Sequence, residues 1–454
     1  MARVVIVSNR VPLPTERGAR AGGLAVGIAD ALKDGGLWFG WSGQVAPGSH
    51  HPVRKVEAGG VTYATIDLNQ EDYDRFYVGY ANSTLWPLLH FRLGLIDFKR
   101  EDLDGYFSVN RTFAAALALE LKPDDIVWIH DYHLIPLGAE LRRLGVRNRL
   151  GFFLHIPFVP ASLFAALPQG EALLRAFLAY DVVGLQTEEH RRDFLDSVRQ
   201  MLGLEADADG RIATADGTAR AIANPIGIDA RSFAAMATKA ERSPETRRLL
   251  SSLVGRDLVI GVDRLDYSKG LPHRFTAFGK LLHDFPEHRQ KVSYLQVAAK
   301  SREDVSEYQA LRRELDRKAG NINGRYAEFD WVPLRYMTRP MSRTTLAGFY
   351  RAARVGLVTP LRDGMNLVAK EFVAAQDHGN PGVLILSRFA GAAEDLTEAL
   401  IVNPYDPAEI TEAMHQALTM KLDERQDRME RLRARVFTNT AESYCRNFLA
   451  ALAA

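Results

Sequence analysis

Strand, turn and helix signals follow one another in the segment Leu258-Val259-Ile260-Gly261-Val262-Asp263-Arg264-Leu265-Asp266-Tyr267-Ser268-Lys269-Gly270. Its first five residues form an apolar run, which suits a parallel strand buried on both faces. Gly270 then lets the chain turn, and helical periodicity follows over residues 272–284. A further apolar run at 292–297 completes a strand–helix–strand unit. This order predicts a layered α/β fold.

The same alternation of strand and helix signals continues along the whole chain. Further strands are expected at residues 4–7, 61–66, 125–130, 150–154, 181–185, 355–358 and 382–386. The run 61–66 is more mixed in polarity, which favours a place nearer a sheet edge. Two successive series of this kind predict two Rossmann-like, doubly wound domains, which bind ligands beyond the carboxyl ends of their strands.

The length of the chain also favours two domains, because 454 residues exceed what one hydrophobic core usually serves. A polar helical stretch at 237–253 lies between the two strand series. We therefore expect a first domain at 1–235, a second at 236–435 and a C-terminal helix at 436–454.

Charge and cysteine content restrict the class of protein. The chain has 57 basic and 56 acidic side chains, a balance that draws it neither to nucleic acid nor to a membrane. Its one cysteine, Cys445, cannot form an intramolecular disulfide. The sequence lacks a secretory signal pattern and an apolar run of roughly 18 residues. We expect a cytoplasmic protein.

Two cationic side chains end the segment 258–270. Arg264 and Lys269 stand five residues apart after a buried strand. An arginine offers a bidentate fork to a phosphate and a lysine a mobile point charge. The spacing fits a phosphate site and, equally, a capped helix start with solvated charges.

A second segment, residues 358–371 (VTPLRDGMNLVAKE), carries more information. A strand ends at Pro360, a glycine-containing loop follows, and a helix opens at Leu367, where backbone N–H groups can hold an anion. Asp363 is placed to accept hydrogen bonds from sugar hydroxyls. Glu371 suits paired ribose hydroxyls, although it could instead only complement the helix dipole.

The first half of the chain offers glycines, aromatic rings and an arginine. Arg10 follows a strand, and the glycine pair at 22–23 precedes an apolar helix. The segment 38–41 (WFGW), Tyr77 and Trp86 supply rings on which sugars stack, but each ring is also consistent with core packing.

Strand ends also carry a His/Asp group, made of Asp131, His133 and His155. Arg302 is a further candidate for binding a phosphate. No i, i+4 pair of ligands and no cysteine set accompanies these residues, so no metal site is expected.

In these segments the chain resembles trehalose-6-phosphate synthases, glycosyltransferase family 20, of the bacterial type without a phosphatase domain. The resemblance runs from about residue 3 to about residue 420. Its motifs are VSNR (7–10), GGL (22–24), WFGWSG (38–43), WIHDYH (128–133), FFLHIPF (152–158), RLDYSKG (264–270) and TPLRDGMNL (359–367).

The resemblance implies a GT-B fold, in which two Rossmann-like domains face a central cleft and the last helix crosses back to the first domain. It implies a retaining, metal-independent transfer of glucose from UDP-glucose, or another NDP-glucose, to glucose 6-phosphate, which forms α,α-trehalose 6-phosphate. It implies no cofactor, and a homotetramer or homodimer.

By the same resemblance, the acceptor site would contain Arg10, Tyr77, Trp86, Asp131 and Arg302. The donor site would contain Gly22, Gly23, Arg264, Lys269, Met341, Asp363, Gly364, Met365, Asn366, Leu367, Val368 and Glu371. The catalytic set would be Asp131, His155, Arg264, Lys269 and Asp363. The leaving diphosphate would help to deprotonate the incoming hydroxyl, while Asp131 and His155 position and polarise the substrates.

Two segments depart from the family pattern. Residues 159–162 (VPAS) replace a proline-rich or Ser-Ser stretch near the acceptor, and Met341 replaces an aromatic residue near the base. The alternatives are a related transferase with another acceptor, such as a glucosylglycerol-phosphate synthase or a cyclitol pseudo-glycosyltransferase, a non-catalytic sugar-phosphate sensor, and an epimerase on the same fold.

Overall fold

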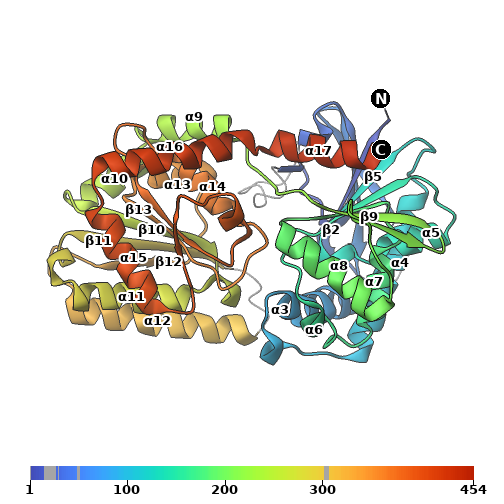
Figure 1. Cartoon of the computed structure of the whole chain (residues 1–454), viewed down its shortest axis with the longest axis horizontal. Helices are drawn as coiled ribbons and strands as arrows, with labels where there is room; N and C mark the ends of the chain where they lie inside the picture. Colours follow the sequence, from blue (N-terminus) through green and yellow to red (C-terminus); the bar gives the residue numbers. More distant parts are fainter. Residues whose placement is uncertain (1, 15–26, 29, 49–51, 301–305) are drawn as a thin grey trace. The chain divides into compact units, whose positions relative to one another are not determined.

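A computed structural model of the chain describes residues 2–14, 27–28, 30–48, 52–300 and 306–454. The chain divides into two compact units, coloured along the sequence in Figure 1. Unit 1 comprises Met1–Ile226 and Ala441–Ala454, and unit 2 comprises Gly227–Thr440.

Unit 1 is built on a sheet of nine strands among the described residues, in the order β3-β4-β2-β1-β5-β6-β7-β9-β8. The pairs β3/β4 and β8/β9 are antiparallel and the others parallel. The strands are β1 (Val4–Arg10), β2 (Gly36–Val45), β3 (Arg54–Ala58), β4 (Val61–Leu68), β5 (Ile126–His130), β6 (Arg149–Phe153), β7 (Val182–Leu185), β8 (Arg211–Thr214) and β9 (Gly217–Ala223).

The central strands of unit 1 are buried on both faces, which explains their continuous apolar runs. In β1, Val5, Ile6 and Val7 are inaccessible to solvent. The more mixed strand β4 lies second from the edge, beside β3. The aromatic segment 38–41 lies within β2, where it contributes to the core.

Helices and helical turns of unit 1 connect these strands. They are η1 (Asp30–Leu32), α2 (Gln70–Asp72), η2 (Tyr73–Leu85), α3 (Trp86–Leu89), η3 (Leu93–Leu95), α4 (Arg100–Ala118), η4 (Tyr132–Leu134), α5 (Leu137–Arg143), α6 (Ala161–Phe164), α7 (Gly170–Phe177), α8 (Glu188–Leu202) and α17 (Ala441–Ala453). The last of these, α17, packs against β6 and β7, so the end of the chain completes the core of unit 1.

Unit 2 contains a parallel sheet of six strands in the described residues, ordered β12-β11-β10-β13-β14-β15. Counted along the chain, this is the 3-2-1-4-5-6 order of dinucleotide-binding sheets. The strands are β10 (Asp257–Arg264), β11 (Val292–Ala299), β12 (Leu334–Met337), β13 (Val355–Val358), β14 (Val383–Ser387) and β15 (Leu400–Val402).

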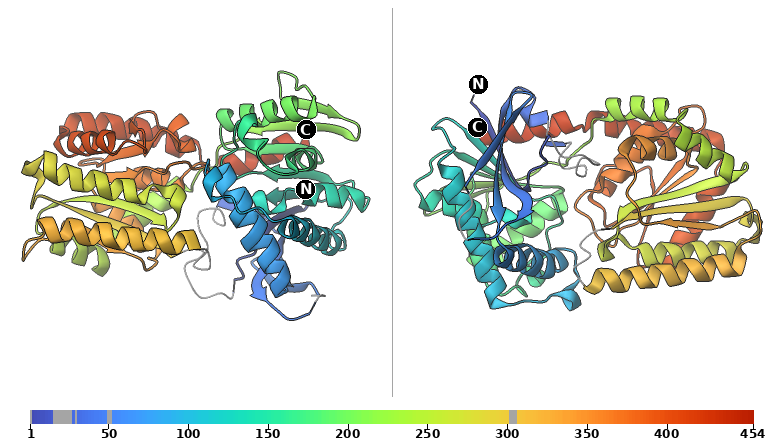
Figure 2. Two further views of the ribbon diagram at one scale, coloured as in Figure 1. Left: turned by 90° about the horizontal axis from the view of Figure 1, so that it is seen from below. Right: turned by 180° about the vertical axis from the view of Figure 1, so that it is seen from behind.

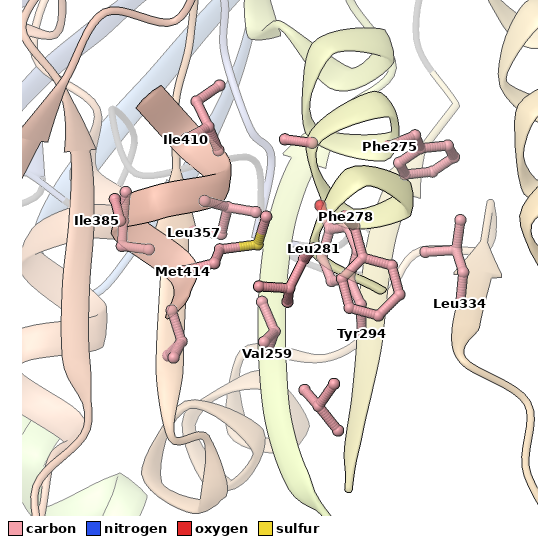
Figure 3. Packing of buried hydrophobic residues seen from close by; sticks show 14 of the residues in the cluster. Val259, Phe275, Phe278, Leu281, Tyr294, Leu334, Leu357, Ile385, Ile410 and Met414 are labelled. Atoms are coloured by element: carbon pink, nitrogen blue, oxygen red, sulfur yellow. The ribbon is translucent and has the colours of Figure 1, made fainter. Parts of the chain in front are cut away.

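Helices cover both faces of the unit 2 sheet (Figure 2). They are α9 (Ala230–Ala240), α10 (Pro244–Leu253), η5 (Tyr267–Lys269), α11 (Leu271–Asp284), η6 (Pro286–His288), α12 (Ser306–Tyr326), α13 (Arg343–Ala352), α14 (Leu367–Ala375), η7 (Gly391–Glu394), α15 (Pro407–Thr419) and α16 (Leu422–Thr438). In Figure 3, Phe278 and Leu281 of α11 meet Val259 and Tyr294 of the sheet, with Met414 of α15 alongside. Burial of each such side chain contributes about 1.5–3 kcal/mol.

The division between the units differs in position from the expected boundaries at 235/236 and 435/436. It falls after Ile226 and after Thr440, because α9 packs against α13 and α14 of unit 2. The polar stretch 237–253 is split into α9 and α10, and the Ser243 side chain caps α10 by accepting from the Thr246 N–H at 3.2 Å.

Across the described part of the chain, none of the helices combines the length and the apolar character that a bilayer span requires.

Candidate active site

The strand order of unit 2 reverses direction between β10 and β13. Open α/β sheets bind ligands at such a point, outside the carboxyl ends of the strands. The two predicted phosphate-binding segments follow these two strands, 258–270 after β10 and 358–371 after β13. The topology therefore brings both segments to one edge of the sheet.

At that edge Lys269 and Asp363 form an ion pair. The Lys269 Nζ lies 2.5 Å from the Asp363 Oδ2, and the Asn366 amide donates to the same oxygen at 3.0 Å. Both side chains of the pair are largely buried, with 11% and 15% of their surface exposed. A partly desolvated pair is held more firmly than a surface ion pair, so the ammonium group is fixed in place.

The turn that carries Lys269 has a defined local structure. The Asp266 carboxylate accepts from the Ser268 N–H at 2.9 Å, which closes the turn before Lys269. Gly270 has φ 68°, and a Cβ at this position would lie 2.5 Å from the Thr359 carbonyl oxygen. Only glycine fits such a left-handed, crowded position. The Leu361 N–H also donates to the Ser268 carbonyl at 2.7 Å, which joins the two segments.

Arg274 lies beneath both segments and is completely buried. Its guanidinium donates to the Lys269 carbonyl at 2.9 Å and to the Thr359 hydroxyl at 2.9 Å. Its charge is balanced by Asp263 at 2.5 Å. Arg274 therefore connects the end of β10, the Lys269 turn and the end of β13.

The loop of Asp363 leads directly into a helix. The backbone at Asp363 is held by Phe389 and Gly391, with N–O distances of 3.0 and 3.2 Å. Asn366 takes a left-handed conformation, φ 75°, immediately before α14 opens at Leu367. The start of a helix presents unsatisfied N–H groups and a positive dipole end, so this turn suits a phosphate. Gly364 and Met365 belong to the same turn, and Val368 is the second residue of α14.

Glu371 lies one turn into α14 and faces Arg343, at 3.3 Å. Burial raises the pKa of Glu371, and the Arg343 charge opposes that rise. Arg343 stands in none of the sequence motifs, because nothing in the sequence distinguishes it from a surface arginine. Met341 lies on the loop between β12 and α13, two residues before Arg343.

Arg264 ends β10 at this edge of the sheet, with an exposed side chain. Among the predicted donor residues that the structure describes, Lys269 and Asn366 both contact the Asp363 carboxylate. Gly22 and Gly23 lie outside the described residues.

In unit 1, the predicted residues Asp131 and His155 follow the neighbouring strands β5 and β6. The Asp131 carboxylate accepts from the His155 backbone N–H at 3.2 Å. Asp131 has φ 77°, a left-handed conformation uncommon for a non-glycine residue and frequent at functional sites. Its own N–H donates to the Phe153 carbonyl at 2.8 Å, which holds the turn.

The His155 ring lies beside a second histidine that sequence reasoning did not select. The His155 Nε2 and the His130 Nδ1 are 3.0 Å apart. Burial lowers the pKa of His155 to about 3. His155 is therefore a neutral imidazole at physiological pH, suited to hydrogen bonding with a sugar rather than to donating a proton from an imidazolium.

Aromatic rings lie next to the end of β1. Tyr77 stacks on His133 with centroids 5.7 Å apart and also contacts Trp41 at 5.9 Å. Trp41 is the register partner of Arg10, whose exposed side chain ends β1. Tyr77 lies on the π-helix η2, and such segments are frequent at functional sites. Arg10 and Tyr77 are thus both neighbours of Trp41.

Trp86 is more deeply placed than Tyr77. It is 4% exposed and packs on His90 and Tyr132, the residue after Asp131. Trp86 therefore supports the residues around Asp131 mainly by packing against them. In the segment 159–162, which departs from the family pattern, Val159 is buried and Ala161 begins the short helix α6. Arg302 lies outside the described residues.

Two Rossmann-like units, with Lys269 and the start of α14 at the switch point of unit 2, have the architecture of GT-B glycosyltransferases. The family model for glycosyltransferase family 20 matches residues 2–454. The chain belongs to glycosyltransferase family 20.

Similar proteins agree with this assignment. A trehalose-6-phosphate synthase from Sinorhizobium fredii is 47% identical over 453 residues, which cover 99% of this chain and 98% of that protein. A crystal structure of an α,α-trehalose-phosphate synthase (UDP-forming) from Burkholderia xenovorans, in complex with glucose-6-phosphate, has a TM-score of 0.96, 47% identity and coverage of 99% of this chain and 100% of that one. An E. coli structure bound with UDP-2-fluoro glucose has a TM-score of 0.94 and 45% identity, and covers 99% of each chain.

Proposed function

We propose that this chain transfers glucose from UDP-glucose to glucose 6-phosphate, with retention of the α configuration, to form α,α-trehalose 6-phosphate. The observation that carries the proposal is the fixed Lys269–Asp363 pair at the start of α14, 2.5 Å between Nζ and Oδ2. The likeness to solved structures described as α,α-trehalose-phosphate synthases (UDP-forming), one of them in complex with glucose-6-phosphate, supports the choice of substrates.

On the donor side, the residues of unit 2 stabilise a departing diphosphate. Lys269 supplies a positive charge whose position Asp363 and Asn366 hold before the substrate arrives. Arg264 supplies a second charge at the same sheet edge, and the N–H groups that open α14 complete the anion site. Preorganised charges of this kind stabilise the charge that develops on the leaving group. Glu371, on the same helix, accepts hydrogen bonds from the ribose hydroxyls.

On the acceptor side, the residues of unit 1 bind and orient glucose 6-phosphate. Arg10 binds the phosphate, Tyr77 and Trp86 enclose the sugar, and Asp131 accepts from a sugar hydroxyl. The family resemblance suggests contact with the donor glucose for the neutral His155 and, separately, for Asp363. The diphosphate oxygen takes the proton of the attacking hydroxyl on the same face, so no protein nucleophile is needed. For Arg302 a role at the acceptor phosphate, and for Gly22 and Gly23 a role in donor binding, rest on the family resemblance alone, because these three residues lie outside the described part of the chain.

Product analysis tests the proposed reaction. The protein is incubated with glucose 6-phosphate and UDP-, GDP- or ADP-glucose, and the products are examined by NMR. An α,α-1,1-linked disaccharide phosphate supports the proposal, and comparison of the rates identifies the nucleotide that Met341 favours. Absence of this product with all three donors contradicts it, and glycerol 3-phosphate and cyclitol phosphates then become the acceptors to test.

We also propose that the transfer uses no metal ion or other cofactor. We propose further that the protein is cytoplasmic and forms a homotetramer or a homodimer. It binds neither nucleic acid nor a membrane. Full turnover after exhaustive treatment with EDTA supports the metal-independent reaction. Light scattering on a sizing column measures the mass in solution, and a monomeric mass would overturn the oligomer.

A further inference from the structure

A cluster of two histidines and a glutamate lies in unit 2, away from the residues described above. Its members are Glu287 and His288, on η6, and His415, on α15. One potential ligand atom from each residue lies within 4.8 Å of the other two. The helix α11 has 14 residues and is about 20 Å long. Lys269 precedes its first turn and the cluster follows its last, so the cluster stands at the opposite end of this helix from the donor site.

The distances within the cluster suit a tetrahedral metal ion. The His288 Nε2 and the His415 Nδ1 are 2.9 Å apart, and the Glu287 Oε1 lies 3.9 Å from the His415 Nδ1. Zinc bonds of 2.0–2.1 Å in a tetrahedron place neighbouring ligand atoms roughly 3.3 Å apart. Small rotations of side chains are therefore sufficient to seat an ion between the three atoms.

The two imidazole rings are held in place by packing. His288 is 7% exposed, and Phe285 stacks on the His415 ring with centroids 4.0 Å apart and planes 12° from parallel. In Figure 3, Met414, the residue before His415, points into the core of unit 2 together with Ile410. Rigid support of this kind reduces the cost of ordering metal ligands.

The two facing nitrogens are both atoms that can bind a metal ion. A neutral imidazole offers one nitrogen lone pair, and the His288 Nε2 and the His415 Nδ1 point toward each other at 2.9 Å. Two facing nitrogens share one proton when no ion is present, and an ion bound between them replaces that proton. The partly exposed His415 and the exposed Glu287 leave a path to solvent.

We propose that Glu287, His288 and His415 bind a Zn²⁺ ion, with water as the fourth ligand. Two imidazole nitrogens with one carboxylate are a ligand set typical of Zn²⁺, whereas Mg²⁺ prefers oxygen ligands only. The ion joins η6 to α15 and stabilises this end of unit 2. It takes no part in glucose transfer.

Titration of the metal-stripped full-length protein with Zn²⁺, followed by calorimetry, tests the proposed site. We expect one Zn²⁺ per chain at this site, and affinity at least about tenfold weaker in the His415→Gln variant. Zn²⁺ should raise the unfolding temperature of the native protein but not that of this variant. Turnover measured without added metal should be the same in the native protein and in the His415→Gln variant.

The matched control is His283→Gln, which removes an exposed histidine near the end of α11 that pairs with Asp284 rather than with the cluster. This control should bind Zn²⁺ as the native protein does. Co²⁺ gives a second readout, because a tetrahedral site produces intense visible absorption that His415→Gln should abolish. Absence of Zn²⁺ binding, equal affinity in His415→Gln and native protein, or an equal loss in His283→Gln would each overturn the proposal.

Discussion

At the residue scale, Lys269 is the side chain on which the proposed chemistry depends most. Its ammonium is fixed 2.5 Å from Asp363, and in the proposed reaction it stabilises the charge of the leaving diphosphate without reorganisation. Loss of one preorganised group of this type costs about 10²–10³-fold in kcat. We expect Lys269→Ala to lose at least about a hundredfold in kcat, measured by the release of UDP at saturating substrates.

Lys280→Ala is the control for this measurement. Lys280 is an exposed lysine on α11 that pairs with Asp284, so its removal should leave turnover unchanged. Thermal unfolding of both variants separates loss of function from loss of fold. Near-native turnover in a folded Lys269→Ala protein would remove the proposed role.

The His155 ring predicts how stability depends on pH. Burial lowers its pKa to about 3 in the folded protein, whereas the unfolded value is about 6.5. Between about pH 6.5 and pH 3 this histidine therefore binds a proton in the unfolded chain but not in the folded chain. The free energy of unfolding is therefore highest above about pH 6.5 and decreases as the pH falls toward 3. The loss is about 1.4 kcal/mol per pH unit, or about 2 kcal/mol between pH 6.5 and 5.

Urea unfolding at pH 7 and pH 5 measures this effect. The native protein should lose more free energy of unfolding over this range than His155→Asn, in which the titrating ring is replaced. Equal losses in the two proteins would mean that the ring titrates normally in the folded state. The activity of the native protein should show no acidic limb from His155 above pH 5.

Residues of the candidate site differ in how far the sequence could predict them. Lys269 and Asp363 each follow a predicted strand, and the strand ends bring them together. Arg343 and Arg274 carried no signal, because an arginine within a helical pattern normally faces solvent. Their partners, Glu371 and Asp263, lie elsewhere in the chain, and single-sequence patterns do not reveal such long-range pairs.

At the element scale, Arg274 joins α11 to the ends of β10 and β13. We expect Arg274→Met to lower the free energy of unfolding by about 3–5 kcal/mol, because Asp263 is left as an unpaired buried charge. Turnover should also fall, because the Lys269 carbonyl and the Thr359 hydroxyl lose their donor. Denaturant unfolding and steady-state kinetics measure the two effects.

The double variant Asp263→Asn/Arg274→Met separates these effects. Removal of the Asp263 charge should restore part of the stability, since no unpaired ion remains. Turnover should stay low, because nothing replaces the bonds to the Lys269 turn. If turnover recovers together with stability, Arg274 serves only as the counter-ion of Asp263.

Elements buried on both faces were the most predictable part of the fold. The strand expected at 258–262 is the core of β10, and the run 292–297 lies within β11. The strands β2, β3, β8, β9, β12 and β15 were not expected. Most of these strands are brief or half-buried and leave weak patterns, but the long, buried strand β2 was missed as well. The sequence left two interpretations of the segment 38–41, rings that stack on sugars or core packing, and strand β2 places the segment in the core.

At the scale of the whole molecule, the chain leaves unit 1 after Ile226 and returns to it at Ala441. Composition and length predicted two domains, but not which unit each boundary helix joins. That choice depends on packing, since α9 contacts α13 and α14 while α17 contacts β6 and β7. The amphipathic pattern of a helix shows only that one face is buried, and not against which partner.

The return of the chain suggests a prediction about the independence of the units. Phe448 of α17 stacks on Trp128 with centroids 4.4 Å apart, and Gly151 and Gly184 leave room for its ring. We expect Phe448→Ala to lower the stability of unit 1 by about 3–5 kcal/mol, through lost burial and a cavity. The affinity for UDP, measured by calorimetry, should stay within about twofold, because the donor residues belong to a unit with its own core.

Phe329→Ala is the matched control, since Phe329 is fully exposed and its loss should change stability by less than about 0.5 kcal/mol. Hydrogen exchange followed by mass spectrometry assigns each loss to a unit. In Phe448→Ala, faster exchange should be confined to strands such as β5 and β6, while β10 and β13 keep native rates. Faster exchange in β10 as well, with weaker binding of UDP, would mean that the two units fold as one cooperative body. The C-terminal helix would then maintain the donor site as well as the core of unit 1.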